Sequence, residues 1–202
     1  MTVGLYKRLI SFILSLFTLT LTITGINNPI IKPFVPSEVV IEPQNVEMLT
    51  VIENGFSDYK IVRGINASPS EKNAANILQR YLEQISGVQL SIVSDETEMA
   101  NHEIIVGKTN REGNGYNIDR EKLDDNGLII KIVGEKLIIA GSELRGTLYG
   151  VYTFLEEILG CHWYTAELIV IPERDNVQIP IATNIEQIPT FEFRETDWIS
   201  PQ

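Results

Sequence analysis

Apolar residues recur at helical spacing in two segments of the chain, and the first segment has clear start and stop signals. Ser68 can cap a helix, Pro69 suits the first helical position, and Glu71 completes a capping box. Gly87 is positioned to end the helix. The segment therefore predicts an amphipathic helix that lies on a sheet. Its buried face is predicted to consist of Ala74, Ala75, Ile77, Leu78, Tyr81, Leu82 and Ile85.

The second helical segment, residues 145–159, has the most regular apolar pattern in the sequence and ends before Gly160. Gly146 and Gly150 are four residues apart, which leaves one side of the helix without side chains. Because each glycine costs about 1 kcal/mol relative to alanine, this spacing favours close packing against another backbone. The face predicted to contact the sheet consists of Leu148, Val151, Tyr152, Leu155, Ile158 and Leu159.

Short β-type runs surround these two helices. They cover residues 59–62, 89–93 and 103–106, and residues 128–133 and 136–140 flank Gly134 and Glu135 as a hairpin. Between them, residues 107–127 form a polar loop rich in Gly, Asn and Asp. We predict an α+β domain over residues 46–188, a two-layer sandwich in which a mixed, mainly antiparallel sheet carries both helices on one face.

The N-terminus has the polarity of an export signal. Lys7 and Arg8 precede the uncharged, apolar residues 9–26, and residues 27–45, with four prolines, have the composition of an extended linker. The run is at the lower length limit of about 18 residues for a membrane span, so a cleaved signal peptide and an uncleaved anchor both remain open. Either one predicts an exported protein that is extracellular, periplasmic or membrane-anchored.

The composition of the chain disfavours some classes of binding partner. The 202 residues are 44% hydrophobic and 21% charged, which is typical of a globular protein with a packed core. The formal net charge of −11, without a basic cluster, disfavours nucleic-acid binding. The single cysteine, Cys161, cannot form an internal disulfide, and we interpret it as a small core residue.

Motifs for catalysis, cofactors and metals were not found. The sequence has no dinucleotide-binding or serine-hydrolase signature, and its two histidines, His102 and His162, lack metal-ligand spacing. We therefore predict no catalytic residue, no cofactor and no metal site. Trp163 and Tyr164 are candidates for stacking on a sugar ring. The alternative is that they contact a neighbouring domain or form an edge of the core.

Three segments together resemble a known family. Residues 145–155, 160–164 and 189–195, in this order, are similar to the N-terminal accessory domain of certain glycosidases, among them α-glucuronidases, β-N-acetylhexosaminidases and a group of exported bacterial proteins. The resemblance extends over roughly residues 46–198. It implies a small α+β sandwich without catalytic residues, followed by a (β/α)8 barrel that performs the chemistry.

By the same resemblance, residues 189–195 would lead into the first barrel strand, with Arg194 near its sugar-facing end. Arg194 thus joins Trp163 and Tyr164 as a candidate substrate-binding residue. A barrel of this kind needs about 250 residues, so residues 189–202 are interpreted as the start of a missing or truncated barrel, mobile in the isolated chain.

Two functions from different classes follow. The first is a non-catalytic module of an exported carbohydrate-active enzyme, with the catalytic barrel as its partner in the same polypeptide. The alternative is a free-standing carbohydrate-binding or interaction protein that uses Trp163 and Tyr164.

Overall fold

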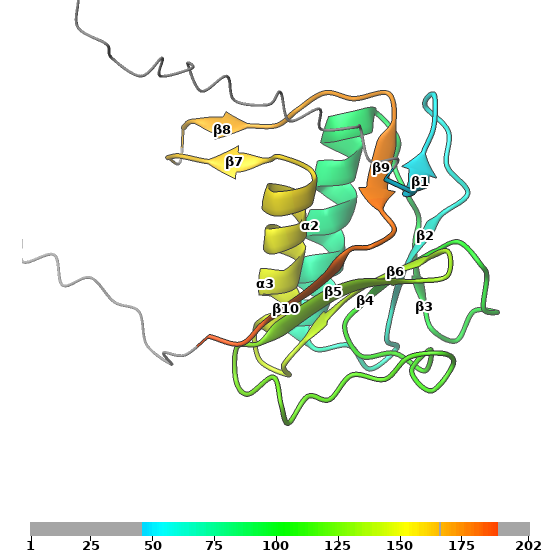
Figure 1. Cartoon of the computed structure of the whole chain (residues 1–202), viewed down its shortest axis with the longest axis vertical. Coiled ribbons are helices and arrows are strands. Elements are labelled where there is room, and N and C mark those ends of the chain that lie inside the picture. The colour runs from blue at the N-terminus through cyan, green and yellow to red at the C-terminus, as the bar shows by residue number, and fades with distance from the viewer. Residues whose placement is uncertain (1–45, 166, 190–202) are drawn as a thin grey trace, which may run out of the picture. The chain divides into compact units, whose positions relative to one another are not determined.

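The computed structural model describes residues 46–165 and 167–189, which belong to a compact unit spanning residues 44–202 (Figure 1). The predicted signal or anchor at residues 1–26, the linker at 27–45 and the barrel-like segment from residue 190 onward, including Arg194, lie outside the described residues. Figure 1 shows a large sheet with two helices over one face.

The first helix, α2 (Pro69–Ser86), forms as its end signals predict. The Ser68 side chain accepts a hydrogen bond from the Glu71 backbone N–H, and the Glu71 carboxylate accepts one from the Ser68 N–H at 2.8 Å. At the other end, Gly87 adopts the left-handed conformation with φ 75°. All seven residues of the predicted inner face are buried.

Six strands form the main sheet, in the spatial order β10-β5-β6-β4-β2-β3. Strands β3, β2, β4 and β6 run parallel, whereas β5 is antiparallel to both β6 and β10. The strand predicted at residues 89–93 is observed at residues 92–94, so its start lies three residues later, and Leu90 before it is buried in the core. The strand bounds are β2 (Lys60–Arg63), β3 (Ile92–Ser94), β4 (Glu103–Val106), β5 (Leu128–Val133), β6 (Lys136–Gly141) and β10 (Asn184–Gln187).

Two small ribbons complete the described strands. Strand β1 (Met48–Ile52) pairs with β9 (Val177–Pro180), and β7 (His162–Trp163) pairs with β8 (Ile169–Val170). Across the described strands, four of the seven pairs are antiparallel. The predicted α+β sandwich with mixed, mainly antiparallel pairing is thus confirmed, and its three parallel pairs all lie in the main sheet.

The second helical segment differs from an ideal helix in its last part. Helix α3 (Gly146–Thr153) continues into a π-helical turn, η1 (Phe154–Ile158), before Gly160 with φ 75°. In this wider turn, Leu159 N–H donates to the Phe154 carbonyl oxygen, five residues back. Phe154, the first residue of this turn, is 1% exposed. The predicted face did not include Phe154, although its α-helical spacing of four residues from Gly150 and three from Val151 places it on the same buried side.

The glycines of the second helix are required by close packing, as predicted. A Cβ atom added to Gly146 would lie 2.0 Å from the Gly127 carbonyl oxygen, and one added to Gly141 would lie 2.2 Å from the Gly146 carbonyl carbon. At Gly150 a Cβ would lie 3.0 Å from the Ile139 side chain. The backbone at the start of α3 therefore rests directly on the end of β6.

Both faces of the main sheet are covered. The helices and one sheet face form the main core, which includes Ile61, Ile104 and Ile139. On the opposite face, Tyr116 and Ile118 from the loop 107–127 pack against the central strands β4 and β6. No helix in the described part of the chain is long and apolar enough to cross a membrane.

Burial of the second helix can be tested at Leu155, which is fully buried. Leu155→Ala removes apolar contacts and leaves a cavity, so we expect a loss of about 2–5 kcal/mol in the free energy of unfolding. Urea unfolding followed by circular dichroism measures this change. The matched control, Leu144→Ala, truncates a leucine that is 65% exposed and should change the midpoint little. An unchanged midpoint for Leu155→Ala would show that the assigned face is wrong.

Candidate functional site

The candidate residues Trp163 and Tyr164 follow the second helical segment, but their surroundings differ. Trp163 is half-buried, and its indole Nε1–H donates to the Tyr81 hydroxyl at 2.8 Å. Its ring meets Tyr81 and Tyr152 edge-on, with centroids 5.4 and 5.3 Å apart. Trp163 thus joins the ribbon β7-β8 to both helices.

Tyr164 is the exposed member of the pair. Its side chain is 64% exposed, and its ring is tilted against the His162 ring at a centroid distance of 5.9 Å. Trp163 and Tyr164 therefore do not form one continuous aromatic platform. The third candidate, Arg194, lies outside the described residues, so the structure does not bring the three together.

Cys161, two residues before Trp163, is fully buried. Burial raises the pKa of its thiol, an effect that the positive charge of Arg174 opposes. The thiolate form that nucleophilic attack requires is therefore disfavoured at neutral pH. This environment fits the interpretation of Cys161 as a core residue.

The most enclosed charges form a cluster on the far side of the sheet, which the sequence analysis did not identify. Glu103, the first residue of β4, is 1% exposed and pairs with two cations. Its Oε1 lies 3.0 Å from the Arg111 NH2 nitrogen, and its Oε2 lies 2.8 Å from Lys136 Nζ. Arg111 is itself 3% exposed and donates further to the Asp95 and Thr97 carbonyl oxygens. The donors of this cluster are therefore used within the fold.

Asp95, the other buried carboxylate in the described chain, has a structural role of the same kind. Its Oδ1 accepts from the Ile65 backbone N–H and its Oδ2 from the Asn110 N–H, each at 2.8 Å. These bonds fix the connections after β2 and β4 to the end of β3. Only the residue types of such a cluster can be read from a sequence, because its members lie on strand ends and loops that meet only in the folded chain.

A second polar group gathers around His102 at the surface. Its Nδ1 lies 2.6 Å from Asp58 Oδ2, its Nε2 lies 3.5 Å from Glu135 Oε1, and its ring stacks on Tyr59. Partial burial lowers the pKa of His102, but the hydrogen bonds and charges of Asp58 and Glu135 outweigh this effect and raise it above the ordinary value. Desolvation, with the same two carboxylates, raises the pKa of Tyr59 to about 12. The positively charged His102 side chain therefore links its own loop to the loop that carries Asp58 and to the turn that carries Glu135.

Residues 106–109, Val-Gly-Lys-Thr, match only the end of a phosphate-binding loop, and the structure shows what this turn contacts. The Lys108 backbone N–H donates to Glu71 Oε1 at 2.8 Å, and Gly107 lies so close that an added Cβ would be 2.4 Å from that oxygen. A carboxylate therefore occupies the position in front of the loop. Within the described ranges, no group of three or more His, Cys, Asp or Glu side chains could hold a metal ion.

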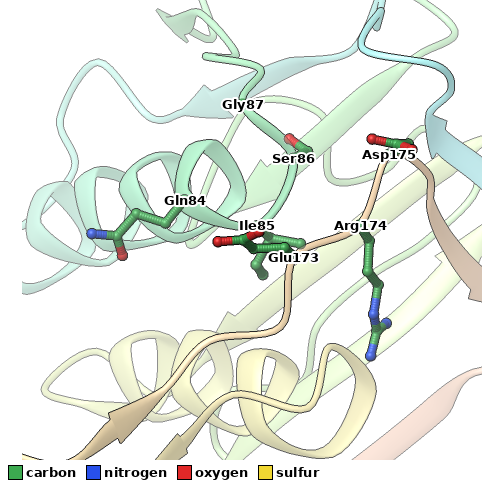
Figure 2. Close-up of a pocket in the computed structure, with 7 residues that line it drawn as sticks. All are labelled: Gln84, Ile85, Ser86, Gly87, Glu173, Arg174 and Asp175. Atoms are coloured by element: carbon green, nitrogen blue, oxygen red, sulfur yellow. The ribbon is translucent and has the colours of Figure 1, made fainter.

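A surface hollow of about 440 Å³ lies where one connection crosses the end of α2 (Figure 2). The Arg174 backbone N–H donates to the Ile85 carbonyl oxygen at 2.8 Å, which satisfies one free carbonyl of the helix end. Figure 2 shows the Arg174 side chain directed away from the other lining side chains. Without an aromatic side chain, the hollow offers no stacking surface for a sugar. Its lining residues are Gln84, Ile85, Ser86, Gly87, Glu173, Arg174 and Asp175.

The Glu103 cluster makes a prediction about stability. Glu103→Gln keeps the shape of the side chain but leaves Arg111 and Lys136 without their countercharge, so we expect a loss of about 3–5 kcal/mol in urea unfolding at pH 7. Glu98→Gln, at an exposed position nearby, changes the net charge equally and is the control. Equal midpoints for the two variants would contradict a stabilising role of the cluster.

The pH dependence follows from the Glu103 hydrogen bonds. Burial acts to raise the pKa of Glu103, but the bonds from Lys136, the Ala100 backbone N–H and Arg111 outweigh it, and the folded-state pKa lies below the ordinary 4.5. The stabilisation is therefore complete above the unfolded-state pKa and is lost as the pH falls through the lower folded-state pKa. The stability difference between the wild type and Glu103→Gln should shrink in this acidic range.

For His102 we predict the opposite dependence of stability on pH. Because its folded-state pKa is raised, its contribution is complete below the unfolded-state value of about 6.5 and is lost as the pH rises through the folded-state pKa. An NMR titration of the imidazole should give a pKa above 6.5 in the wild type, and Asp58→Asn should lower it. A wild-type pKa at or below the ordinary value would disprove the charged arrangement.

Comparison with solved structures gave distant likenesses. One is BtGH115A, described as a family GH115 4-O-methyl-α-glucuronidase with specificity for decorated arabinogalactans, with a TM-score of 0.49 and 16% identity. Another is the GH20 β-N-acetylhexosaminidase from Streptomyces coelicolor A3(2), with a TM-score of 0.46 and 12% identity. The matches cover 72% and 74% of this chain, but only 19% and 26% of those chains.

Comparison of the sequence with curated proteins gave no match. Comparison with family models matched residues 54–154 to the model described as the glycosyl hydrolase family 67 N-terminus. This range runs from the turn after β1 to the first residue of η1 and includes both α2 and α3. Because the match spans half of the chain, the protein belongs to the family of glycosyl hydrolase family 67 N-terminal domains, as the resemblance of its motifs predicted.

Proposed function

We propose that this chain is the non-catalytic N-terminal module of an exported glycoside hydrolase of α-glucuronidase or hexosaminidase type, and that it supports a catalytic (β/α)8 barrel in the same polypeptide. The observation that carries the proposal is its membership in a family defined by the N-terminus of glycosyl hydrolases. A family named for the N-terminus of an enzyme implies that the catalytic machinery lies further along the chain.

The use of the buried carboxylates supports a non-catalytic role. Glycoside hydrolysis requires two carboxyl groups on either side of the scissile bond, about 5–9.5 Å apart and facing the sugar. In the described part of the chain, the buried carboxylates Glu103 and Asp95 accept hydrogen bonds from structural donors on both of their oxygens. Neither lines the surface hollow.

The activity of the chain tests this role directly. We expect the purified 202-residue protein to hydrolyse neither aryl glucuronides nor aryl N-acetylhexosaminides, because the buried carboxylates of the described residues are already bonded within the fold and form no acid/base pair. Release of the chromogenic aglycone measures hydrolysis. Turnover that one Asp or Glu substitution in this chain abolishes, while a neighbouring substitution does not, would contradict the proposal.

Export is the second part of the proposal and rests on Lys7 and Arg8 followed by the apolar residues 9–26. Fusion of residues 1–45 to a reporter that is active only outside the cytoplasm tests it. Export should be lost when Leu14→Arg and Leu16→Arg interrupt the apolar run. N-terminal sequencing of the exported product would distinguish a cleaved signal from an anchor.

The exposure of Tyr164 favours a second candidate, a free-standing carbohydrate-binding protein. Calorimetric titration with oligosaccharides containing glucuronic acid or N-acetylglucosamine separates the two functions. Binding that Tyr164→Ala abolishes and Phe56→Ala preserves would support this candidate, since Phe56 is also exposed but lies in the turn after β1. The reading frame beyond codon 202 provides an independent test of the two functions. A continuation with the alternating strands and helices of a barrel would support the enzyme module.

A further inference from the structure

Three asparagines of the chain are each followed by glycine, at residues 54–55, 114–115 and 126–127. Asparagine is a chemically labile residue, because the next backbone nitrogen can attack its side-chain amide and release ammonia. A following glycine opposes this attack least, since it has no Cβ and its backbone is the most flexible. The attack also requires that the glycine nitrogen is free and that the surrounding backbone can move. The environments of the three pairs therefore determine which of them reacts in the folded protein.

The pair Asn126–Gly127 is held in place on both sides of its peptide bond. Gly127 is buried, and its N–H donates to the Leu123 carbonyl oxygen at 2.8 Å. Its carbonyl oxygen accepts from the Ser142 N–H at 2.9 Å and would lie 2.0 Å from a Cβ added to Gly146. The attacking nitrogen is therefore engaged, and moving it would separate the start of α3 from the backbone on which it rests.

The pair Asn54–Gly55 is exposed but forms the centre of a closed two-residue turn. Glu53 and Phe56 exchange both of their backbone hydrogen bonds across it, each at 2.9 Å. The Asn54 N–H donates to Asn176 Oδ1 at 2.8 Å, and both turn residues have positive φ, 49° and 77°. These short bonds hold the backbone of the turn in one conformation.

The pair Asn114–Gly115, in the loop 107–127, combines exposure with weak restraint. Both residues are exposed. The Asn114 N–H and Nδ2 both donate to the Arg111 carbonyl oxygen, at the long distances of 3.2 and 3.4 Å. The Gly115 N–H has no acceptor among the residues that the structure describes. The atom nearest to a Cβ added at Gly115 is Val133 Cγ1, 3.8 Å away, so there is space for the backbone to move.

We propose that Asn114 is a site of spontaneous deamidation in the folded protein. The Gly115 nitrogen bonds to Asn114 Cγ, the bond from Cγ to Nδ2 breaks, and the proton of the Gly115 nitrogen leaves with Nδ2 as ammonia. The product is a five-membered succinimide ring. Water then adds to one of the two ring carbonyl groups and opens the ring, which yields aspartate or isoaspartate. No atom is oxidised or reduced, and water is the only co-reactant.

The two products should affect the loop differently. Both replace a neutral amide by a carboxylate that is ionised at neutral pH. Isoaspartate also adds one atom to the main chain, within the turn in which the Gly113 N–H donates to the Tyr116 carbonyl oxygen at 2.9 Å. Tyr116 packs against Ile105 and Ile138 on the face of the sheet opposite the helices. Isoaspartate at position 114 should therefore loosen this cover, whereas aspartate should leave it in place.

Peptide mapping by mass spectrometry tests the proposal. The purified 202-residue chain is incubated at mildly alkaline pH, and the deamidated fraction at each of the three asparagines is followed with time. A parallel sample in urea, above the unfolding transition, gives the rate of each pair without the fold. Asn114→Gln is the matched variant, because its longer side chain cannot close the five-membered ring. Asn114→Asp supplies the aspartate product free of isoaspartate.

In the folded chain we expect Asn114 to deamidate faster than Asn126 by a factor on the order of ten or more, because the reaction at Asn126 requires local opening of the fold. Asn54 should react at a rate between these two. In urea the three rates should converge. Asn114→Gln should abolish the reaction at position 114 and leave the rates at Asn54 and Asn126 unchanged.

Three results would overturn the proposal. A rate at Asn114 no higher than that at Asn126 or Asn54 in the folded chain would reject Asn114 as the reactive site. The same ratio of rates in urea as in the folded chain would show that neighbouring sequence, and not the fold, determines reactivity. The isoaspartate form, separated by ion exchange, should unfold at lower urea concentration than Asn114→Asp, and equal midpoints would reject the effect on the loop.

Discussion

The buried carboxylate of Glu103 organises the far side of the sheet. It sits at the start of β4 and binds Arg111 from the loop 107–127 and Lys136 from the start of β6. Because an unpaired ion in the interior is costly, these partners fix the path of the loop. The loop then places Tyr116 and Ile118 over β4 and β6. Parallel strands, which are normally covered on both faces by helices, are here covered by helices on one face and by a loop on the other.

Local chemistry made much of the fold predictable. The capping box at Ser68 and Glu71 and the left-handed Gly87 define α2, and Gly134 closes the hairpin of β5 and β6. Pairing between distant strands is not encoded locally. The parallel neighbours of β2 depend on helix packing, and the later start of β3, at Ile92, accompanies the burial of Leu90 in the core. The π-helical turn was not predicted, because its pattern of apolar residues is close to that of an α-helix.

In the candidate site too, local sequence predicts which residues are neighbours, whereas contacts between distant residues determine their surroundings. The sequence places Trp163 and Tyr164 side by side, but their environments depend on Tyr81, which lies 82 residues from Trp163. That contact makes Trp163 a link between the ribbon and the helices, and it leaves Tyr164 exposed. The salt-bridge cluster was not predicted, since Asp95 and Arg111 resemble ordinary surface residues of polar loops and Glu103 resembles an exposed residue at the start of a strand.

The few buried charges of the domain are paired within the fold, and part of its exposed apolar surface lies on the ribbon β7-β8. Leu168, Ile169 and Val170 of this ribbon are 43–54% exposed. A ribbon with only two residue pairs is marginally stable alone, so its order depends on the contacts of Trp163 with Tyr81 and Tyr152. Those contacts have already met the entropic cost of ordering the ribbon.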